Sequence, residues 1–190
     1  MKKVEINEIY DFSLSINNGK LIKSKRGLNI QFGPIYIEDT TDNLWEYIKN
    51  NVSTELFNKT YAEYINFREM SEESLNKIAN SPWWTDDAKL LDKYIKLWKK
   101  INNIVNNYKN NKYSKNNVAY QEECCYSCFT IGGDLLQVCC RSSDMYFGIR
   151  SDIIVFTLLA KELNIPKMLI IMQQPHFYIN TKSVARRKEK

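Results

Sequence analysis

The chain has 190 residues, of which 44% are hydrophobic and 26% are charged, values that are typical of a globular protein with a single core. No apolar run approaches the roughly 20 residues that cross a bilayer, and the charged, polar N-terminus lacks the apolar core of an export signal. These features exclude membrane-spanning and exported classes, so we expect a cytoplasmic protein.

The formal net charge of +5 is concentrated at the C-terminus, because residues 182–190 carry five basic residues and one acidic residue. No aromatic residue lies among these charges, so the segment is interpreted as a solvated end rather than as a nucleic-acid-binding arm. We therefore expect one domain over residues 1–181 and a basic C-terminal tail over 182–190.

The first half of the chain alternates between helical and strand-like patterns. Apolar residues at helical spacing predict a helix over residues 5–16, which Asn17-Asn18-Gly19 ends. Residues 20–37 alternate in places and contain glycines and a proline, a pattern that predicts strands and turns. Three further helices are expected from capping residues and apolar spacing: residues 41–48 with Thr41 or Asp42 as the cap, residues 54–67, and a short helix from Ser71 that ends before Ser81-Pro82.

The second half contains the longest expected helix and a hairpin. An apolar stripe predicts a helix over residues 86–108, followed by a polar loop over 106–117. A strand over 123–131 turns at Gly132-Gly133 and returns over 135–140. Residues 152–163 are apolar on nearly every side, so we expect a buried central helix, and strand-like segments follow over 167–172 and 176–179. The fold class is therefore α+β, a mixed sheet with a buried central helix and flanking helices.

All five cysteines lie between residues 124 and 140. Their odd number and the cytosolic character of the chain argue against a disulfide framework. The pattern Cys124-Cys125-x-x-Cys128 … Cys139-Cys140 contains a Cys-x-x-Cys, but adjacent residues on a strand point to opposite faces, so four thiolates do not converge. We expect no metal site and interpret most of these cysteines as small buried hydrophobic residues.

Two polar motifs flank the expected central helix. Arg141-Ser142-Ser143-Asp144, with Gly148 four residues later, precedes the helix, and a guanidinium beside a hydroxyl suits a phosphate. Pro175 to Asn180 follows it, and His176 and Tyr178 share one face of a strand and can both hold a sugar hydroxyl. Each residue alone has an ordinary structural explanation, so the indication of a nucleotide site comes from the two motifs together.

These motifs resemble the nucleotide half of the active site in the thymidylate synthase and deoxycytidylate (CMP) hydroxymethylase superfamily. There, Arg-Ser-x-Asp-x-x-x-Gly precedes a long central helix and His-x-Tyr-x-Asn lies on a later strand. The resemblance implies the thymidylate-synthase-like fold, a homodimer and a pyrimidine nucleoside monophosphate as ligand. The residues that it implies for substrate binding are Arg141, Ser142, His176 and Tyr178.

Three further residues are implied by shorter matches to the same superfamily. Residues 60–67 are similar to the helix that bears the catalytic glutamate, which here is Glu63, although a solvated glutamate is the alternative. Residues 18–27 resemble an early loop whose arginine, here Arg26, closes on the phosphate. The implied nucleophile is Cys124, opposite Arg141 or Ser142 across the hairpin, where a nearby arginine favours the thiolate. Cys125 is the alternative nucleophile, because a slip of one residue reverses the face.

The identity of the base depends on Asp152. The synthases carry an asparagine there that reads uracil, whereas the enzymes of phages and antibiotic pathways that hydroxymethylate cytidine nucleotides carry aspartate. A carboxylate accepts from N4 of cytosine, and its protonated form also donates to N3. An N-cap role at the start of the helix is the alternative.

The resemblance therefore implies C5 hydroxymethylation of dCMP or CMP with 5,10-methylenetetrahydrofolate. Cys124 attacks C6 of the base, Glu63 relays protons and Asp144 lies near the folate. Two alternatives stay open, namely a catalytically inactive nucleotide-binding or regulatory protein and a dUMP-methylating synthase. The inactive alternative is kept because the family's proline and histidine beside the cysteine are absent, no arginine stands near residues 115–117, and only ten residues follow Asn180.

Overall fold

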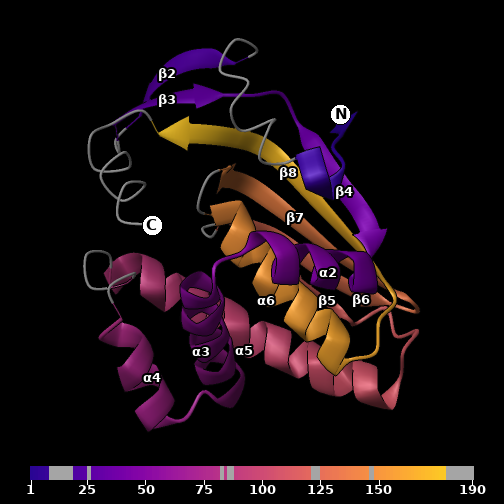
Figure 1. Cartoon of the computed structure of the whole chain (residues 1–190). Helices are drawn as coiled ribbons and strands as arrows, with labels where there is room; N and C mark the ends of the chain where they lie inside the picture. The colour runs from indigo at the N-terminus through magenta and orange to yellow at the C-terminus, as the bar shows by residue number, and fades with distance from the viewer. Residues whose placement is uncertain are drawn as a thin grey trace.

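The computed structural model describes residues 1–8, 19–24, 27–81, 84, 88–120, 125–145 and 148–178. In these residues eight strands form one mixed sheet, with helices gathered on one side of it (Figure 1). The expected α+β class with a mixed sheet and flanking helices is confirmed. The strands, in their order across the sheet, are β1 (Lys2–Lys3), β4 (Ile35–Thr40), β8 (Lys167–Tyr178), β7 (Leu135–Asp144), β6 (Tyr126–Gly132) and β5 (Val118–Tyr120).

A second hairpin extends the sheet at the C-terminal end of β8. Strand β2 (Lys20–Ser24) pairs with β3 (Gly27–Gln31), and β3 pairs antiparallel with the last residues of β8. Strand β8 therefore contacts β3 near its end and β4 near its beginning, while parallel β7 runs along its other edge. Strands β3, β7 and β8 therefore meet at the place where His176 lies.

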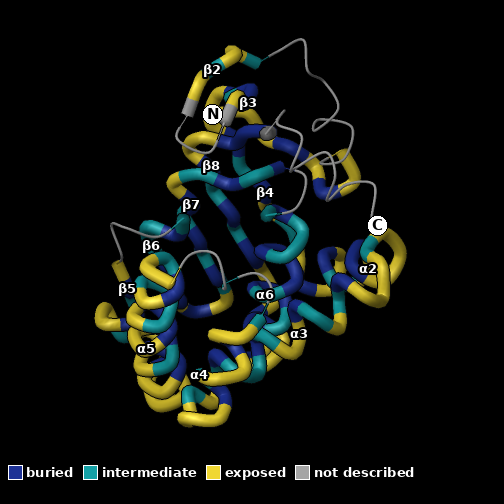
Figure 2. Tube along the Cα trace, turned by 90° about the vertical axis from the view of Figure 1, so that its left-hand side faces the viewer, coloured by how far each residue is buried: buried dark blue, intermediate teal, exposed yellow. Residues whose placement is uncertain are grey.

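The helical layer follows the apolar stripes of the sequence. It comprises the 3-10 turn η1 (Ile6–Glu8) and the helices α2 (Thr41–Asn51), α3 (Thr54–Glu69), α4 (Glu72–Ala79), α5 (Ala88–Asn110) and α6 (Gly148–Glu162). Helix α6 contacts β7, α2 and α3, and it is largely buried (Figure 2). Its buried position matches its sequence, because apolar residues occur on every side of it. No helix among the described residues is long and apolar enough to cross a membrane.

The alternation of buried residues changes near one end of the sheet. Leu136, Val138 and Cys140 of β7 are buried, but the next buried residue is Ser143 rather than Ser142. In β8 the buried residue after Met172 is likewise Pro175, three residues later instead of two. Strand β6 has a register shift between Tyr126 and Cys128. Such irregularities re-aim side chains and are common beside functional sites. Here they turn Ser143 into the interior.

Several predicted boundaries are wrong by a few residues. The side chain of Thr40, not that of Thr41 or Asp42, caps α2, because the Thr41 hydroxyl donates instead to the carbonyl of Ile165 at 2.5 Å. Helix α5 continues to Asn110, so the first residues of the expected loop are helical. The expected helix over 5–16 is represented by η1 alone, and its residues 9–18 lie outside the described part of the chain. Strand β5 was not predicted.

Two differences bear on function. Strand β7 continues to Asp144, so the Arg141 to Asp144 motif belongs to the strand instead of following it. Helix α6 begins at Gly148, four residues before the predicted start at Asp152. Both elements were underestimated because polar residues at their ends interrupt the apolar pattern on which the prediction rests.

Candidate functional site

Asp152 lies in the second turn of α6 and is buried. The Tyr126 hydroxyl donates to its Oδ1 atom in a short hydrogen bond, and the Ser143 hydroxyl donates to its Oδ2 atom at 3.0 Å. Burial raises the pKa of Asp152 to about 6, and the two hydroxyl donors oppose that rise. The N-cap alternative is wrong, since a cap precedes the first turn and both carboxylate oxygens here accept from side chains.

The pairing of three strands places Gln31, His176 and Asp144 in one row across the sheet. His176 of β8 is the register partner of both Gln31 on β3 and Asp144 on β7. Directly paired residues share a face and lie about 5 Å apart. The backbone carbonyl of His176 also accepts from the N–H of Met145 at 2.9 Å, which fixes the end of β7 against β8. Two residues that were singled out separately in the sequence, Asp144 and His176, are thus neighbours.

The row and Asp152 belong to the same region. The charge of Asp144 contributes to the raised pKa of Asp152, so the two carboxyl groups lie within electrostatic reach of each other. A side chain added at Gly148 would come within 3.2 Å of the Ser143 hydroxyl oxygen and 3.5 Å of the Asp144 Cβ atom. Glycine at the start of α6 therefore permits the close approach of this helix to the end of β7.

The cysteine segment meets the arginine motif at the same end of the sheet. The N–H of Arg141 donates to the carbonyl of Cys125 at 2.6 Å. Cys125 is half-buried, and its thiol and the Asp152 carboxylate both contribute to raising the pKa of the buried Cys140, for which desolvation is the main cause. Cys124, the predicted nucleophile, lies outside the described residues. The structure thus describes only the alternative candidate, which is the residue opposite Arg141.

The remaining predicted phosphate and sugar ligands are described to different extents. Ser142 is half-buried and is paired with Gln174, while the Arg141 side chain is exposed. Arg26 lies outside the described residues. Tyr178 is described only as the last residue of β8, where its register partner is Asn29. The assignment of Arg26, Arg141, Ser142 and Tyr178 as ligands therefore stays a prediction.

Glu63 lies on α3 and is half-buried rather than solvated. Its Oε1 atom accepts from the Ser81 hydroxyl at 2.7 Å. Burial raises the pKa of Glu63, and the Ser81 hydroxyl, the Lys59 charge and the Trp84 indole oppose the rise. A carboxyl group with a raised pKa is suited to proton transfer.

A series of aromatic contacts connects the surroundings of Glu63 with Asp152. The ring centroids of Trp84 and Tyr94 are 4.9 Å apart, and those of Tyr94 and Tyr126 are 5.5 Å apart. The Tyr126 hydroxyl in turn donates to Asp152. Tyr126, Ser143, Ser81 and Trp84 were not predicted as site residues. Sequence spacing does not reveal them. The strand irregularities direct Tyr126 and Ser143 toward Asp152. The turn after α4 brings Ser81 and Trp84 close to Glu63.

No group of three or more His, Cys, Asp or Glu side chains that could hold a metal ion occurs among the residues the structure describes. Four of the cysteines, Cys125, Cys128, Cys139 and Cys140, are described, and each has a free thiol. The side chains gathered at this end of the sheet are hydroxyls, carboxyls, an imidazole and thiols, which suit hydrogen bonding, proton transfer and nucleophilic chemistry.

Comparison with known proteins bears on the fold. No protein-family model matches the chain, and no curated protein matches its sequence. Among solved structures, the chain is similar to the crystal structure of thymidylate synthase from T4 phage, with a TM-score of 0.69 over 97% of this chain and 80% of that chain. The chain has the thymidylate-synthase fold. The sequence identity of 16% carries the comparison no further than the fold.

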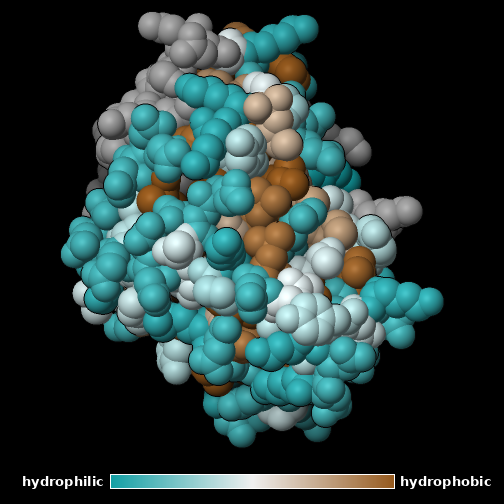
Figure 3. Space-filling view, turned by 90° about the vertical axis from the view of Figure 1, so that its right-hand side faces the viewer, coloured by the Kyte–Doolittle hydropathy of each residue, from teal (hydrophilic) through white to brown (hydrophobic). Residues whose placement is uncertain are grey.

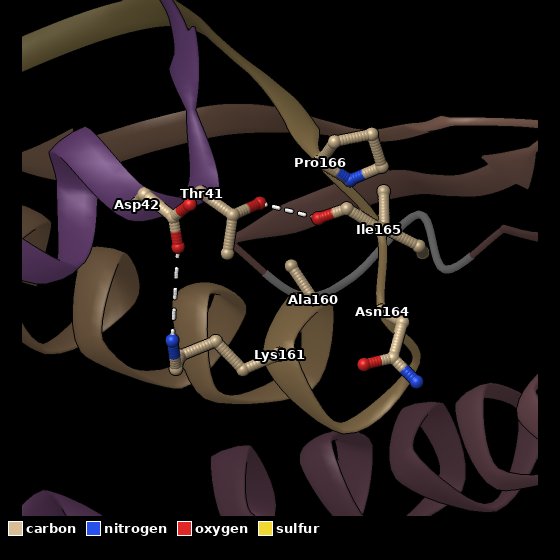
Figure 4. Close-up of a pocket in the computed structure, with 7 residues that line it drawn as sticks. All are labelled: Thr41, Asp42, Ala160, Lys161, Asn164, Ile165 and Pro166. Carbon is tan, nitrogen blue, oxygen red and sulfur yellow. Dashed lines mark hydrogen bonds and ion pairs between the residues drawn. The ribbon is translucent and has the colours of Figure 1, made fainter.

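A separate surface pocket lies at the opposite end of α6 from Asp152 (Figure 4). It is lined by Thr41, Asp42, Ala160, Lys161, Asn164, Ile165 and Pro166. The Lys161 ammonium approaches the Asp42 carboxylate at 3.8 Å, so the two charges in this pocket face each other. None of the predicted site residues lines it.

Proposed function

We propose that the chain transfers a one-carbon unit to C5 of a cytidine monophosphate and forms the 5-hydroxymethyl derivative. The observation that carries the proposal is the buried carboxyl group of Asp152, which two hydroxyl groups hold in place and to which we assign the reading of the base. With a pKa raised by burial to about 6, its neutral form is accessible close to neutral pH. That form offers a donor for N3 of cytosine beside an acceptor for the N4 amino group.

The sugar and phosphate are assigned to the row and to the arginine motif. His176, paired with Asp144 and buried at the end of β8, holds a sugar hydroxyl together with Tyr178. Arg141, Ser142 and Arg26 bind the phosphate. The exposed position of Arg141 supports this assignment, since a guanidinium at the mouth of a site meets a charged group without being desolvated first.

The chemistry is assigned to Cys124 and Glu63. The thiolate of Cys124, or of Cys125, adds to C6 of the base and makes C5 nucleophilic. Glu63 exchanges protons with water and with the reacting base, and its raised pKa supports that role. When bound, 5,10-methylenetetrahydrofolate would supply the one-carbon unit and leave as tetrahydrofolate. Water supplies the hydroxyl oxygen, C5 loses its proton, and the thiolate is released from C6. The donor-rich pterin of this cofactor needs acceptors, and the half-buried Asp144 carboxylate beside His176 is a group of that kind.

A homodimer is part of the proposal. On the face of the sheet away from α6, half-buried hydrophobic side chains occur at Leu135, Leu169 and Ile171 of the central strands. Figure 3, viewed from the side where β4, β5 and β6 lie in Figure 1, shows a band of hydrophobic residues among hydrophilic ones. Such a surface is suited to packing against a second sheet. Analytical ultracentrifugation tests it, and a monomer at all concentrations contradicts it.

The reaction is tested by tritium release from C5-labelled CMP, dCMP and dUMP in the presence of methylenetetrahydrofolate. We expect release from a cytidine nucleotide, and 5-hydroxymethylcytosine as the base of the product. Cys124→Ser and Cys125→Ser are compared with the matched variant Cys128→Ser, which changes a thiol on β6. The nucleophile variant should lose at least about a thousandfold in rate, since a hydroxyl is a far weaker nucleophile than a thiolate.

Each outcome separates the alternatives. Release from dUMP alone contradicts cytosine recognition through Asp152 and favours a methyl-transferring synthase. Nucleotide binding without release from any of the three substrates favours an inactive nucleotide-binding protein. Full activity in both Cys124→Ser and Cys125→Ser contradicts the assignment of the nucleophile.

A further inference from the structure

Asn29 of β3 is a buried polar residue without an evident structural purpose. Its side chain is 2% exposed, and among the described residues no donor reaches its Oδ1 atom. A buried acceptor without a donor is unfavourable for folding. Such a group on a strand that is paired on both sides therefore calls for a ligand or another compensating contact.

The position of Asn29 points to the candidate site. It is the register partner of Tyr178, and Gln31, two residues further along the same strand, is the partner of His176. Side chains two apart on a strand share a face. The Asn29 side chain is thus a diagonal neighbour of His176, and such neighbours lie roughly 7–8 Å apart.

Other buried polar atoms without partners show that the lack of a partner alone does not make a site. The Oδ1 atom of Asn117 and the hydroxyl of Thr157 also lack partners in the described part of the chain. Asn117, however, lies in the turn before β5, where its Nδ2 atom donates to the carbonyl of Asn111 at 3.0 Å. Its backbone N–H and carbonyl are also bonded, to Ser114 and Ile131. Asn117 therefore has a structural role, whereas Asn29 lies beside the predicted sugar ligands.

We propose that the Oδ1 atom of Asn29 accepts a hydrogen bond from a ribose hydroxyl, so that the preferred substrate is the ribonucleotide CMP rather than dCMP. The inference rests on the proposed function, in which His176 and Tyr178 already hold one hydroxyl of the sugar. Deoxyribose has no second hydroxyl to offer on its ring. A ribose has a 2′-hydroxyl next to the 3′-hydroxyl, and that donor satisfies the buried acceptor.

The same geometry predicts the discrimination. When dCMP binds, the Asn29 oxygen stays buried and unpartnered, and a site built for a hydroxyl disfavours the analogue that lacks it. We expect wild-type protein to bind CMP at least about tenfold more tightly than dCMP. Isothermal titration with each nucleotide measures this ratio without requiring turnover.

Asn29→Leu removes the acceptor with little change of shape. We expect the CMP to dCMP ratio to fall to within about threefold, through weaker CMP binding, while the stability of the ligand-free protein is unchanged or increased because an unpartnered polar group has been removed. Asn29→Thr, which keeps an oxygen acceptor and suits a strand, should retain part of the preference. Asn117→Leu is the matched control, since it alters another buried asparagine and should leave the ratio unchanged.

The outcomes distinguish this inference from the function on which it rests. Equal binding of CMP and dCMP by wild-type protein, or an unchanged ratio in Asn29→Leu, overturns the role of Asn29 and leaves cytidine binding intact. If neither nucleotide binds at millimolar concentration, the proposed function and the inference are both wrong. If Asn29→Leu does not fold, Asn29→Thr takes its place, and a ratio unchanged in that variant or equal binding by wild-type protein overturns the inference.

Discussion

The two ends of α6 each hold a carboxylate in an opposite electrostatic setting. Near the start of the helix, the described partners of Asp152 are two neutral hydroxyl groups, and burial raises its pKa to about 6. In the last turn, Glu162 accepts from Arg68 at 2.8 Å, Tyr64 at 2.7 Å and Lys109 at 3.2 Å. The Arg68 hydrogen bond is the main reason that the pKa of Glu162 is lowered to about 2.

The different surroundings of Asp152 and Glu162 indicate that one carboxyl group has a functional role and the other a structural role. Glu162 is neutralised by cations from α3 and α5, so its charge ties three helices together. Among the described residues no cation pairs with Asp152, and its burial as a charged group opposes folding. A perturbed, uncompensated carboxyl group in the interior is typical of a site whose ligand completes it.

The largest expected effect on stability concerns Glu162, in the last turn of α6. Arg68→Ala should lower the free energy of unfolding by about 3 kcal/mol, because Glu162 and Asn102 both lose a partly buried guanidinium and Glu162 keeps only its more exposed partner Lys109 and the Tyr64 hydroxyl among the described residues. Urea denaturation at pH 7 measures the change. Lys77→Ala, which breaks an exposed pair with Glu73, is the matched control and should cost less than about 0.5 kcal/mol. Similar losses in the two variants contradict the structural role of the Arg68 pair.

Asp152→Asn tests the other end of the helix. A folded-state pKa raised from 3.8 to about 6 means that the folded protein binds the additional proton, so stability is full below pH 4 and falls as the pH rises through 6. The loss amounts to at most about 3 kcal/mol. We expect this part of the pH dependence to disappear in Asp152→Asn, as measured by urea denaturation between pH 4 and 8. Parallel curves for the two proteins contradict the uncompensated burial of Asp152.

Tyr126→Phe tests the setting of Asp152 further, with a smaller expected effect on stability. It removes a donor that lowers the pKa of Asp152, so the fall of stability should move to higher pH. The loss of one buried hydrogen bond to a carboxyl group should cost about 1–2 kcal/mol at pH 7. Tyr94→Phe, which keeps the ring beside Tyr126, serves as the control and should leave the pH dependence unchanged. A pH dependence unaltered in Tyr126→Phe contradicts the coupling.

The two ends of α6 also differ in how far the sequence predicts them. The α+β class, the buried helix and the strand-like segments over 167–172 and 176–179 follow from apolar periodicity, which is strong in the core. The structure joins the two segments in β8. The joint presence of Arg141, Asp144 and His176 indicated one site, and the register confirms that Asp144 and His176 are neighbours. The partners of Asp152 were not predictable, since Ser143 faces it only because β7 departs from regular alternation. No local pattern in the sequence encodes that departure.

The smallest effect concerns the acid response of Glu162. A pKa lowered from 4.5 to about 2 contributes stability that is present above pH 4.5 and is lost as the pH falls through 2. The side chain is 32% exposed, so solvent screening reduces the contribution to about 1 kcal/mol. Glu162→Gln should therefore show a shallower loss of stability between pH 4.5 and 2.5 than wild type, by urea denaturation. Because Asp152 is already protonated in that range, the result isolates one end of the helix. An equal loss in both proteins would mean that Glu162 is not held by its cations, and the contrast between the two ends of α6 would then fail.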